Sequence, residues 1–414
     1  MLALTNQEMK DFVDDFARIE KLMKKGIHKD EKTGREYFTG YSYNTLYDWD
    51  QYFDAIVQLY LDWDTKYIKN GIKIFLDHQR EDGFIMRRIQ APITPEEKAK
   101  ISPEITHITE EENKEMIKPF LSQIIFLLYK HERDLTWLTP DDYNRLKKYI
   151  NYWIDQAKSH ENGLAVWNSA PHSGMDDQVE RAGGWGACVS QGVDLNSFLY
   201  RECRAFSFLA DLFQKKDDTL YFSAEAEHLK NQVRTILWCE EDGFFYDFRL
   251  DSGKLVRVKS SVGFAPLWAG IATKNQAERL VREHLLNPAE FWRAFPIPSY
   301  AANQTCYREE RLPGDVGCNW RAQTWIPVNY YVAHGLADYG YVDIFRQLSF
   351  KTYKMVKKIG EREYYNTDSC TGKGLNPFWG WSLLAYFMPM EAELGYDPTK
   401  LSLGLSDIAK IRVV

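Results

Sequence analysis

The stretch ENGLAVWN, Glu161 to Asn168, has counterparts 80 residues away on either side. They are EDGFIMRR (81–88) and EDGFFYDF (241–248), and each places a glycine after an acidic or polar pair: Gly83, Gly163 and Gly243. Between successive glycines, apolar residues recur with a helical period in two segments. The repeating unit is therefore predicted to be a helical hairpin with a Gly-aromatic connection at one end.

The same periodicity dominates the whole chain, and strand-like alternation is confined to short pieces beside turns, such as 243–248. It predicts about twelve helices, near 6–25, 50–63, 65–78, 113–131, 140–157, 194–214, 219–236, 259–271, 275–286, 320–338, 341–358 and 377–391. About six hairpins would close into an (α/α)6 toroid, although an open solenoid could use the same hairpins. We expect the all-α toroid because polar and aromatic clusters recur at one kind of connection, as if gathered at one mouth.

No Pro/Ser/Gly linker divides the chain, so residues 1–414 are expected to form one catalytic domain. The one long charged insertion is 89–112, QAPITPEEKAKISPEITHITEEEN. A loop of that length is either a lid or disordered, and we expect a lid.

Composition narrows the class of protein. The net charge of -7 argues against a nucleic-acid partner. The 13 Trp, 25 Tyr and 23 Phe residues suffice both for a core and for a pocket lined with the flat rings that sugars favour. Six cysteines without CxxC or zinc spacing predict free thiols and no metal site. The N-terminus lacks the features of a signal peptide and no apolar run is long enough for a membrane span, so a cytoplasmic location is expected.

The run SGMDDQVER, 173–181, is the strongest candidate for a catalytic loop. Glycines and aromatics surround its acids, which is typical of a loop shaped to hold a ligand. We predict that Asp176 is a catalytic acid and that Asp177 supports it. Trp167 and Asn168, which precede the run, and Arg181, which ends it, are candidate ligands of the substrate.

Two segments nearer the N-terminus add candidates. YNTLYDWDQYF (43–53) opens a helix, and Tyr47, Trp49 and Asp50 could stack on a sugar or accept bonds from its hydroxyls. An Asp there could instead be a helix N-cap. Gln123 lies inside the apolar run near KPFLSQ (118–123) and is either a satisfied core amide or a pocket ligand.

Two segments nearer the C-terminus complete the set. NWRAQTW (319–325) carries Trp320, Arg321 and Trp325, and the arginine is either stacked between the two indoles or aimed at the substrate. EREYYN (361–366) precedes a Gly-rich turn and carries Glu363, whose pKa could be tuned by the neighbouring tyrosines. Further candidate ligands in this part of the chain are Tyr365, Trp379 and Trp381.

Three function classes compete. Two carboxylates on separate polar loops at one mouth are the minimum apparatus for glycoside hydrolysis. A non-catalytic sugar-binding protein could use the same scaffold. Asp176, Asp177 and Glu180 also match a DDxxE pattern that binds diphosphates through magnesium, but the glycines nearby disfavour the helix it needs and no second acidic motif accompanies it.

In these stretches the chain resembles glycoside hydrolase family 63, in the clan that also holds the inverting trehalases. It is most similar to the short bacterial members, of which mannosylglycerate hydrolases are typical. The resemblance runs from about 37 to 390 and rests on WD (49–50), SGMD (173–176), VDLN (193–196), WRAQTWIPVNY (320–330) and EREYYN with TGKG and FWGWS (361–382). The sequence departs from the family at Glu180, where an arginine is usual, and at Ala322-Gln323, which replaces Gly-Pro.

The resemblance implies an inverting α-glycosidase in which Asp176 is the general acid and Glu363 the general base, with no metal or organic cofactor. It implies a small carbohydrate substrate, an α-glucoside or α-mannoside such as glucosylglycerate or mannosylglycerate, with neutral α-glucosides as the alternative. Arg181, Arg87, Arg88 and Lys118 are the cations expected to face an anionic aglycone. Neither a membrane nor a nucleic acid is expected as a partner, and the sequence leaves a homo-oligomer open.

Overall fold

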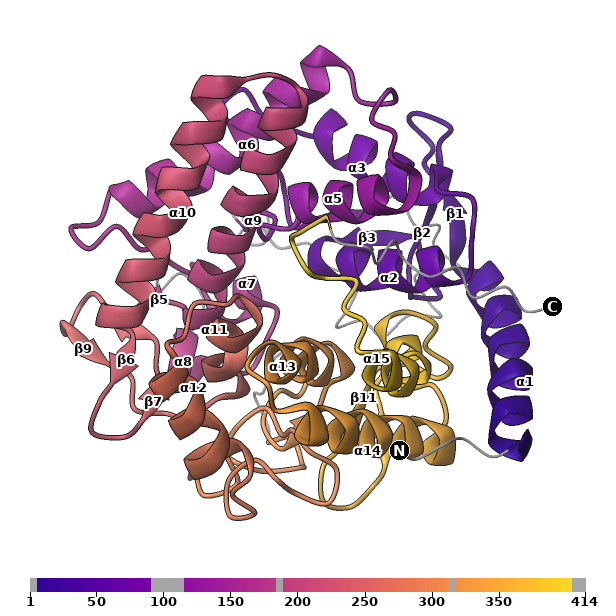
Figure 1. The fold of residues 1–414 in the computed structure, drawn as a ribbon, viewed down its shortest axis with the longest axis vertical. Helices are drawn as coiled ribbons and strands as arrows, with labels where there is room; N and C mark the ends of the chain where they lie inside the picture. Colours follow the sequence, from indigo (N-terminus) through magenta and orange to yellow (C-terminus); the bar gives the residue numbers. More distant parts are fainter. Residues whose placement is uncertain (1–5, 91–114, 184–188, 313–317, 404–414) are drawn as a thin grey trace.

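The protein is described from a computed structural model, in which residues 6–90, 115–183, 189–312 and 318–403 are described. Helices form two concentric rings, and Figure 1 shows the outer helices arranged around the inner ones. The inner ring consists of α2 (Asp48–Tyr60), α5 (Leu121–Glu132), α9 (Val193–Leu212), η4 (Ser261–Phe264) with α11 (Ala265–Trp268), α13 (Ile326–Asp338), and η6 (Trp381–Tyr386) with α15 (Met388–Leu394). The outer ring consists of α1 (Asn6–Met23), α3 (Lys66–Asp77), α6 (Pro140–Lys158), α10 (Lys216–Ile236), α12 (Lys274–Arg279) with η5 (Leu280–Leu285), and α14 (Val342–Ile359).

The inner ring is closed, because each of its members packs on the next and η6 packs back on α2. The chain alternates between outer and inner helices throughout, which is the (α/α)6 toroid that the sequence predicts. All the predicted helices are present. Three begin clearly later than predicted: α5 at Leu121 rather than 113, α13 at Ile326 rather than 320, and η6 at Trp381 rather than 377. Pro327 at the start of α13 fits a first helical turn, where its missing N–H costs nothing.

The three repeated glycines occupy equivalent places. Gly83, Gly163 and Gly243 follow the outer helices α3, α6 and α10, and their φ angles are +96°, +66° and +65°. Only glycine adopts this left-handed conformation without strain. The hairpin unit predicted from their spacing is thereby confirmed.

Short strands and turns between the helices were not predicted, apart from the piece at 243–248. The antiparallel pairs are β1 (Ile27–Lys29) with β2 (Glu36–Phe38), β3 (Thr45–Tyr47) with β4 (Arg88–Gln90), β6 (Trp238–Cys239) with β7 (Phe244–Phe245), β8 (Phe248–Arg249) with β5 (Ser190–Gln191) and β9 (Lys254–Leu255), and β11 (Tyr364–Asn366) with β10 (Gln323–Thr324) and β12 (Gly372–Lys373). Short helices η1 (Lys24–Gly26), α7 (Ala170–Ser173) and α8 (Val179–Ala182) complete the elements named here. Two or three residues are too few for alternation to be recognised in a sequence.

The inner helices all begin at one rim of the toroid. Trp49 at the start of α2 contacts Trp381 at the start of η6 and Trp320 just before α13. Lys118, before α5, pairs with Asp48 of α2. The segments that precede these helices are those in which the sequence placed its polar-aromatic motifs, so the motifs meet at this rim.

The opposite end of the inner ring is covered by the chain after α15. Lys130, in the last turn of α5, donates to the carbonyls of Pro398 (3.0 Å) and Lys400 (3.1 Å), and Arg201 of α9 donates to that of Thr399 (2.6 Å). Figure 1 shows this yellow segment crossing the middle of the ring. One end of the barrel is therefore filled by protein, and the rim with the motifs is the other.

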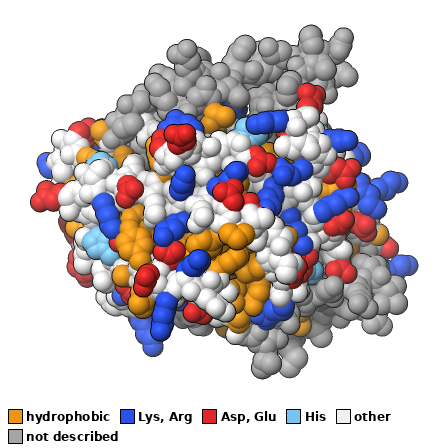
Figure 2. Space-filling model, turned by 90° about the horizontal axis from the view of Figure 1, so that it is seen from above, with side chains coloured by type: hydrophobic (Ala, Val, Ile, Leu, Met, Phe, Trp, Pro, Cys, Tyr) orange, Lys and Arg blue, Asp and Glu red, His pale blue; other side chains and the backbone are white. Residues whose placement is uncertain are grey.

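Most of the insertion predicted at 89–112 lies outside the described residues; 88–90 form β4. On the face in Figure 2, Lys and Arg side chains are interspersed with Asp and Glu. In the described part of the chain, no helix has the length and apolar character needed to cross a bilayer. The described cysteines are free, as expected, whereas Cys188 lies outside the described residues.

Candidate active site

Four of the predicted tryptophans meet at the rim. The rings of Trp320 and Trp325 are stacked with centroids 3.7 Å apart. Trp381 lies 5.8 Å from Trp325 and 6.5 Å from Trp49, which is itself 5.8 Å from Trp320. Three segments far apart in sequence thus form one aromatic cluster beside the carboxylates described next.

Asp176 lies in the turn between α7 and α8. Gly174 ends α7 with φ +80°, which turns the chain so that the next residues face the rim. Oδ2 of Asp176 accepts a hydrogen bond from the backbone N–H of Cys318 at 2.8 Å. Burial raises the pKa of this half-buried carboxyl above its ordinary value, against the opposing effect of Arg87.

Glu363 lies directly before β11 and is only 7% exposed. Its Oε2 accepts from the backbone N–H of Leu375 at 3.0 Å, and the thiol of Cys318 lies 3.6 Å from its Oε1. Burial raises the pKa of Glu363 to about 7, and the negative charge of Asp176 adds to the increase. The structure therefore brings together two carboxylates from motifs that lie far apart in the sequence.

Three cations act electrostatically on Asp176. Arg87 pairs with Glu115 at 3.4 Å and donates to the carbonyl of Pro171. Lys118 is fully buried, with its Nζ 3.1 Å from Oδ2 of Asp48. Arg88 stands opposite Tyr47 in the β3–β4 pair. All three lower the pKa of Asp176, so they favour its ionised form electrostatically.

Asp50, in the first turn of α2 beside Trp49, is 4% exposed, and its carboxyl group interacts with the side chain of Tyr41. Burial raises the pKa of Asp50 to about 7, and the charge of Asp48 contributes. Among the described residues, Oδ1 of Asp50 has no hydrogen-bond partner. A buried acceptor without a partner is costly in a folded protein, and a ligand hydroxyl would satisfy it.

Asp177 and Arg321 form an ion pair next to the Asp176 loop. Oδ1 of Asp177 accepts from the N–H of Trp320 at 2.8 Å, and its Oδ2 lies 3.2 Å from Nε of Arg321. Arg321 also donates to Glu180 at 2.7 Å. Arg321 therefore pairs with acids and does not stack between the two indoles, which stack on each other. Asp177 and Glu180 share this arginine, so two of the three acids of the DDxxE pattern are engaged in ion pairs within the protein.

Arg181 has a structural role. It is 1% exposed, lies 2.7 Å from Asp247 and 3.3 Å from Asp194, and donates to Gln178 at 2.9 Å. Its guanidinium is enclosed by protein acceptors and holds the start of α9 to β8. Its position near Asp176 in the sequence did not reveal the two acids that pair with it, and the expectation that Arg181 faces an anionic aglycone stays a prediction.

Three further candidates are also structural. Gln123 donates to the carbonyl of Pro119 (2.8 Å) and accepts from Arg201 (2.9 Å). The indole of Trp167 is fully buried and donates to Asp194 at 2.9 Å. The hydroxyl of Tyr365, which is fully buried, donates to the carbonyl of Gly360 at 2.9 Å. Their polar groups are satisfied by other parts of the chain, so each has a structural role in the fold, and the expectation that these three also bind substrate stays a prediction.

Two further candidates are placed by hydrogen bonds to other segments. Trp379 donates to the carbonyl of Thr39 at 3.0 Å, which fixes it against the β2–β3 connection. Asn168 is partly exposed, and its backbone N–H donates to His172 at 3.1 Å. By contrast, Trp381 donates to the backbone carbonyl of Glu363 at 2.9 Å and so helps to fix the candidate base.

Sequence reasoning missed Cys318, Tyr41 and the buried Asp48–Lys118 pair. Cys318 stands two residues before Trp320, and that proximity to a quoted motif was the one signal available. Its contacts with Asp176 and Glu363 connect residues 142 and 45 positions away, respectively. The local sequence pattern carries no information about contacts between residues so far apart in the chain.

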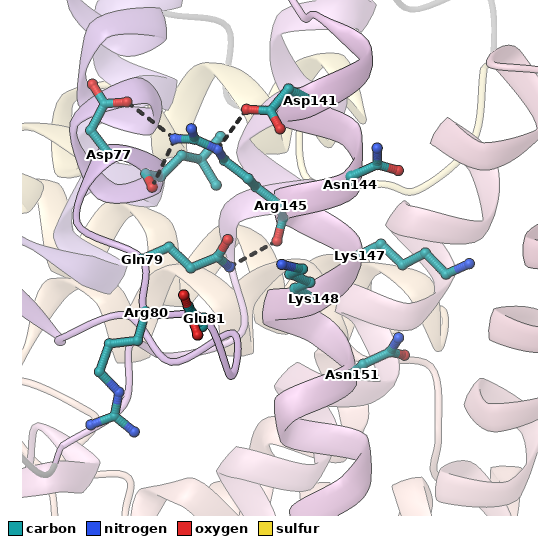
Figure 3. Close-up of a pocket in the computed structure, with 11 residues that line it drawn as sticks. Asp77, Gln79, Arg80, Glu81, Asp141, Asn144, Arg145, Lys147, Lys148 and Asn151 are labelled. Atoms are coloured by element: carbon teal, nitrogen blue, oxygen red, sulfur yellow. Dashed lines mark hydrogen bonds and ion pairs between the residues drawn. The ribbon is translucent and has the colours of Figure 1, made fainter.

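A hollow lies on the outer wall between α3 and α6 (Figure 3). Arg145 at its centre pairs with Asp77 (3.3 Å) and Asp141 (2.7 Å), and Gln79 donates to its carbonyl (2.8 Å). These charges compensate one another, so nothing at the centre of this hollow calls for a ligand. The catalytic candidates lie at the rim instead.

The chain is similar to known glycoside hydrolases. The family model described as "Mannosylglycerate hydrolase MGH1-like glycoside hydrolase domain" matches residues 43–382. A mannosylglycerate hydrolase from Thermus thermophilus is 30% identical over 199 residues, which are 47% of this chain and 44% of that protein. A cytosolic neutral trehalase from Saccharomyces cerevisiae is 25% identical over 180 residues, 40% of this chain and 23% of that protein. The sequence matches thus span less than half the length of these curated relatives.

The similarity in fold covers more of the chain than the similarity in sequence does. The crystal structure of a GH63 mannosylglycerate hydrolase from Thermus thermophilus in complex with glucose superposes with a TM-score of 0.69 at 20% identity, covering 90% of this chain and 99% of that one. The neutral trehalase of Saccharomyces cerevisiae superposes with a TM-score of 0.59 at 18% identity, covering 88% and 76%. Since the family model spans most of the chain, the chain belongs to the mannosylglycerate hydrolase MGH1-like family of glycoside hydrolases, within family 63.

Proposed function

We propose that this chain, as one catalytic domain, hydrolyses a small α-glycoside with inversion, and that Asp176 is the general acid and Glu363 the general base. The observation that carries the proposal is the meeting of these two carboxylates, from separate loops, around Cys318. Inversion needs one carboxyl group to protonate the leaving oxygen and another to activate water on the opposite face of the sugar.

Their environments suit a pair that shares one proton. The productive state has Asp176 protonated and Glu363 ionised, which is one proton for two carboxyl groups. Glu363 has a pKa of about 7 through burial, and that of Asp176 is also raised. The cations around Asp176 favour its carboxylate, so a ligand that offsets their charge would move the shared proton toward Asp176.

For the substrate we propose a glycoside with a carboxylate in its aglycone, glucosylglycerate or mannosylglycerate. The positive charges of Arg87, Arg88 and Lys118 act on the proposed acid, and an anion bound beside it would be compensated by them. Relatives named mannosylglycerate hydrolase support this choice. Asp50, with its unpartnered Oδ1, would accept from a hydroxyl of the cleaved sugar.

Relatives named trehalase favour a second candidate, a neutral α-glucoside. Turnover of mannosylglycerate, glucosylglycerate and uncharged glucosides of similar size separates the two. We expect a higher kcat/KM for the glycerate glycosides and a reduced preference in Arg88→Gln. The control, Arg80→Gln, changes an outer arginine that pairs with Asp82 at 2.5 Å and should leave the preference unchanged.

The mechanism is tested by following the anomer of the released sugar by NMR, together with Asp176→Asn and Glu363→Gln. General acid–base assistance contributes roughly 10²–10⁴-fold, so each variant should fold and lose at least that much turnover. Retention of configuration, or a loss of only a few-fold in either variant, contradicts the assignment.

A further inference from the structure

Cys318 makes hydrogen bonds to both proposed catalytic carboxylates. Its backbone N–H donates to Oδ2 of Asp176 at 2.8 Å, and its thiol lies 3.6 Å from Oε1 of Glu363. It is partly buried, and it stands immediately before the segment whose Trp320 N–H holds Asp177. One short stretch of backbone therefore fixes both members of the Asp176–Asp177 pair.

We propose that Cys318 is a positioning residue, which fixes the distance between the two carboxylates and donates its S–H to the ionised form of Glu363. This rests on the proposed function of the pair. The S–H is a weak donor, so it holds Oε1 in place without a strong bond that the carboxylate would have to break when it accepts a proton from water. The other oxygen, Oε2, is held by the N–H of Leu375 at 3.0 Å.

The thiol is neutral in this environment. Burial raises the pKa of Cys318 well above its ordinary value, and the charges of Glu363 and Asp176 add to the increase. A protonated thiol is a donor, whereas a thiolate beside Glu363 would repel it. Among the described residues, the titratable or charged groups that influence Glu363 or Cys318 include Asp176, Tyr41, Tyr43, Tyr364 and Arg311.

The first test does not depend on any substrate. The electrostatic interaction between two groups is reciprocal. Because the carboxylate of Glu363 raises the pKa of the Cys318 thiol, removing that carboxylate must lower the pKa of the thiol. We expect the pH of half-maximal alkylation of Cys318, followed by peptide mass spectrometry, to fall in Glu363→Gln relative to the unchanged chain. Cys370, which is also partly buried, is the internal control and should keep its pH dependence. An identical profile for Cys318 in both proteins overturns the proposal.

The second test uses the reaction. In Cys318→Ala the backbone N–H to Asp176 remains, but Glu363 loses a donor to its ionised form. We expect kcat to fall roughly three- to tenfold with KM nearly unchanged, and the alkaline limb of the pH profile to move upward. Cys318→Ser should restore part of both effects, and Cys370→Ser should show neither.

Different results would contradict the catalytic pair and the positioning role of Cys318. If Asp176→Asn and Glu363→Gln abolish turnover while Cys318→Ala leaves kcat and the pH profile unchanged, the positioning role is wrong and the catalytic pair stands. If those two variants remain active, the proposed function itself is wrong. A Cys318→Ala variant that loses activity without any change in pH profile, and is not rescued by serine, has lost structure only and also contradicts the positioning role.

Discussion

At the scale of the residue, the two neighbouring acids of the 173–181 loop differ in their partners. Asp176 is half-buried and accepts from a backbone N–H, whereas Asp177 is 2% exposed and paired with Arg321. Breaking a buried ion pair on one side costs about 3–5 kcal/mol when the other charge is left behind. Glu180 also binds Arg321 and offsets part of that cost.

We therefore predict that Asp177→Asn lowers the free energy of unfolding by about 1–3 kcal/mol and reduces kcat less than Asp176→Asn does. Chemical denaturation and steady-state kinetics on both variants give the comparison. Greater loss of turnover in Asp177→Asn at full stability would mean that the catalytic acid is misassigned.

The pair of carboxyl groups also predicts a pH dependence. The active form carries one proton on the pair, and the pair loses that proton as pH rises through the folded pKa of Glu363, about 7. We expect kcat/KM to fall above about pH 7 and to be maximal on the acid side of it. Asp50→Asn removes the other carboxyl of the site with a pKa of about 7, and the limb should persist in it.

At the scale of the element, α5 depends on a carboxylate from α9. Phe120, the residue before α5, gives no side-chain cap, and Glu202 instead accepts from the N–H groups of Ser122 (2.6 Å) and Gln123 (3.3 Å). The positive end of a helix favours such a charge. Burial outweighs this attraction and raises the pKa of Glu202 from 4.5 to about 7.

Because the folded pKa of Glu202 is raised, its contribution to stability is present below pH 4.5 and is lost as pH rises through about 7. The loss amounts to about 3 kcal/mol at 1.36 kcal/mol per pKa unit. We predict that Glu202→Gln lacks this dependence, so that its stability relative to the unchanged chain improves from pH 5 to pH 8. Urea denaturation at both pH values measures it, and a constant difference would contradict the role of Glu202.

At the scale of the whole molecule, the segment after α15 holds the closed end of the toroid. His334 of α13 lies 3.3 Å from Asp397, Lys130 binds the carbonyls of Pro398 and Lys400, and Arg201 binds that of Thr399. The segment thus connects α5, α9 and α13, three members of the inner ring.

We predict that a chain ending at Tyr396 is less stable than one ending at Leu403 by roughly 3–5 kcal/mol, because buried charges on three helices lose their partners. Residues 404–414 are absent from both chains, so the difference reports on 397–403 alone. Thermal and urea unfolding followed by circular dichroism measure it, and equal stability would exclude this role for the segment.

The sequence by itself determined the helices and the hairpin repeat, because helical periodicity and the left-handed turns at Gly83, Gly163 and Gly243 are local properties. It favoured a closed ring over an open solenoid, and the packing of η6 on α2 shows that the ring closes. It also placed Trp49, Asp176, Trp320 and Glu363 in motifs that the structure gathers at one rim. Their shared position follows from the alternation of outer and inner helices, which returns each connecting loop to the same side.

Only the tertiary structure decided which polar groups are satisfied by other parts of the chain. Arg181, Gln123 and Trp167 appear as ligands in sequence, but their partners Asp247, Arg201 and Asp194 lie 66, 78 and 27 residues away. The sequence pattern indicated no role for Cys318, because its contacts with Asp176 and Glu363 form only when distant loops meet. The physical reason is that burial and pairing are properties of the packed chain, whereas the sequence pattern reports only the periodicity of its neighbours.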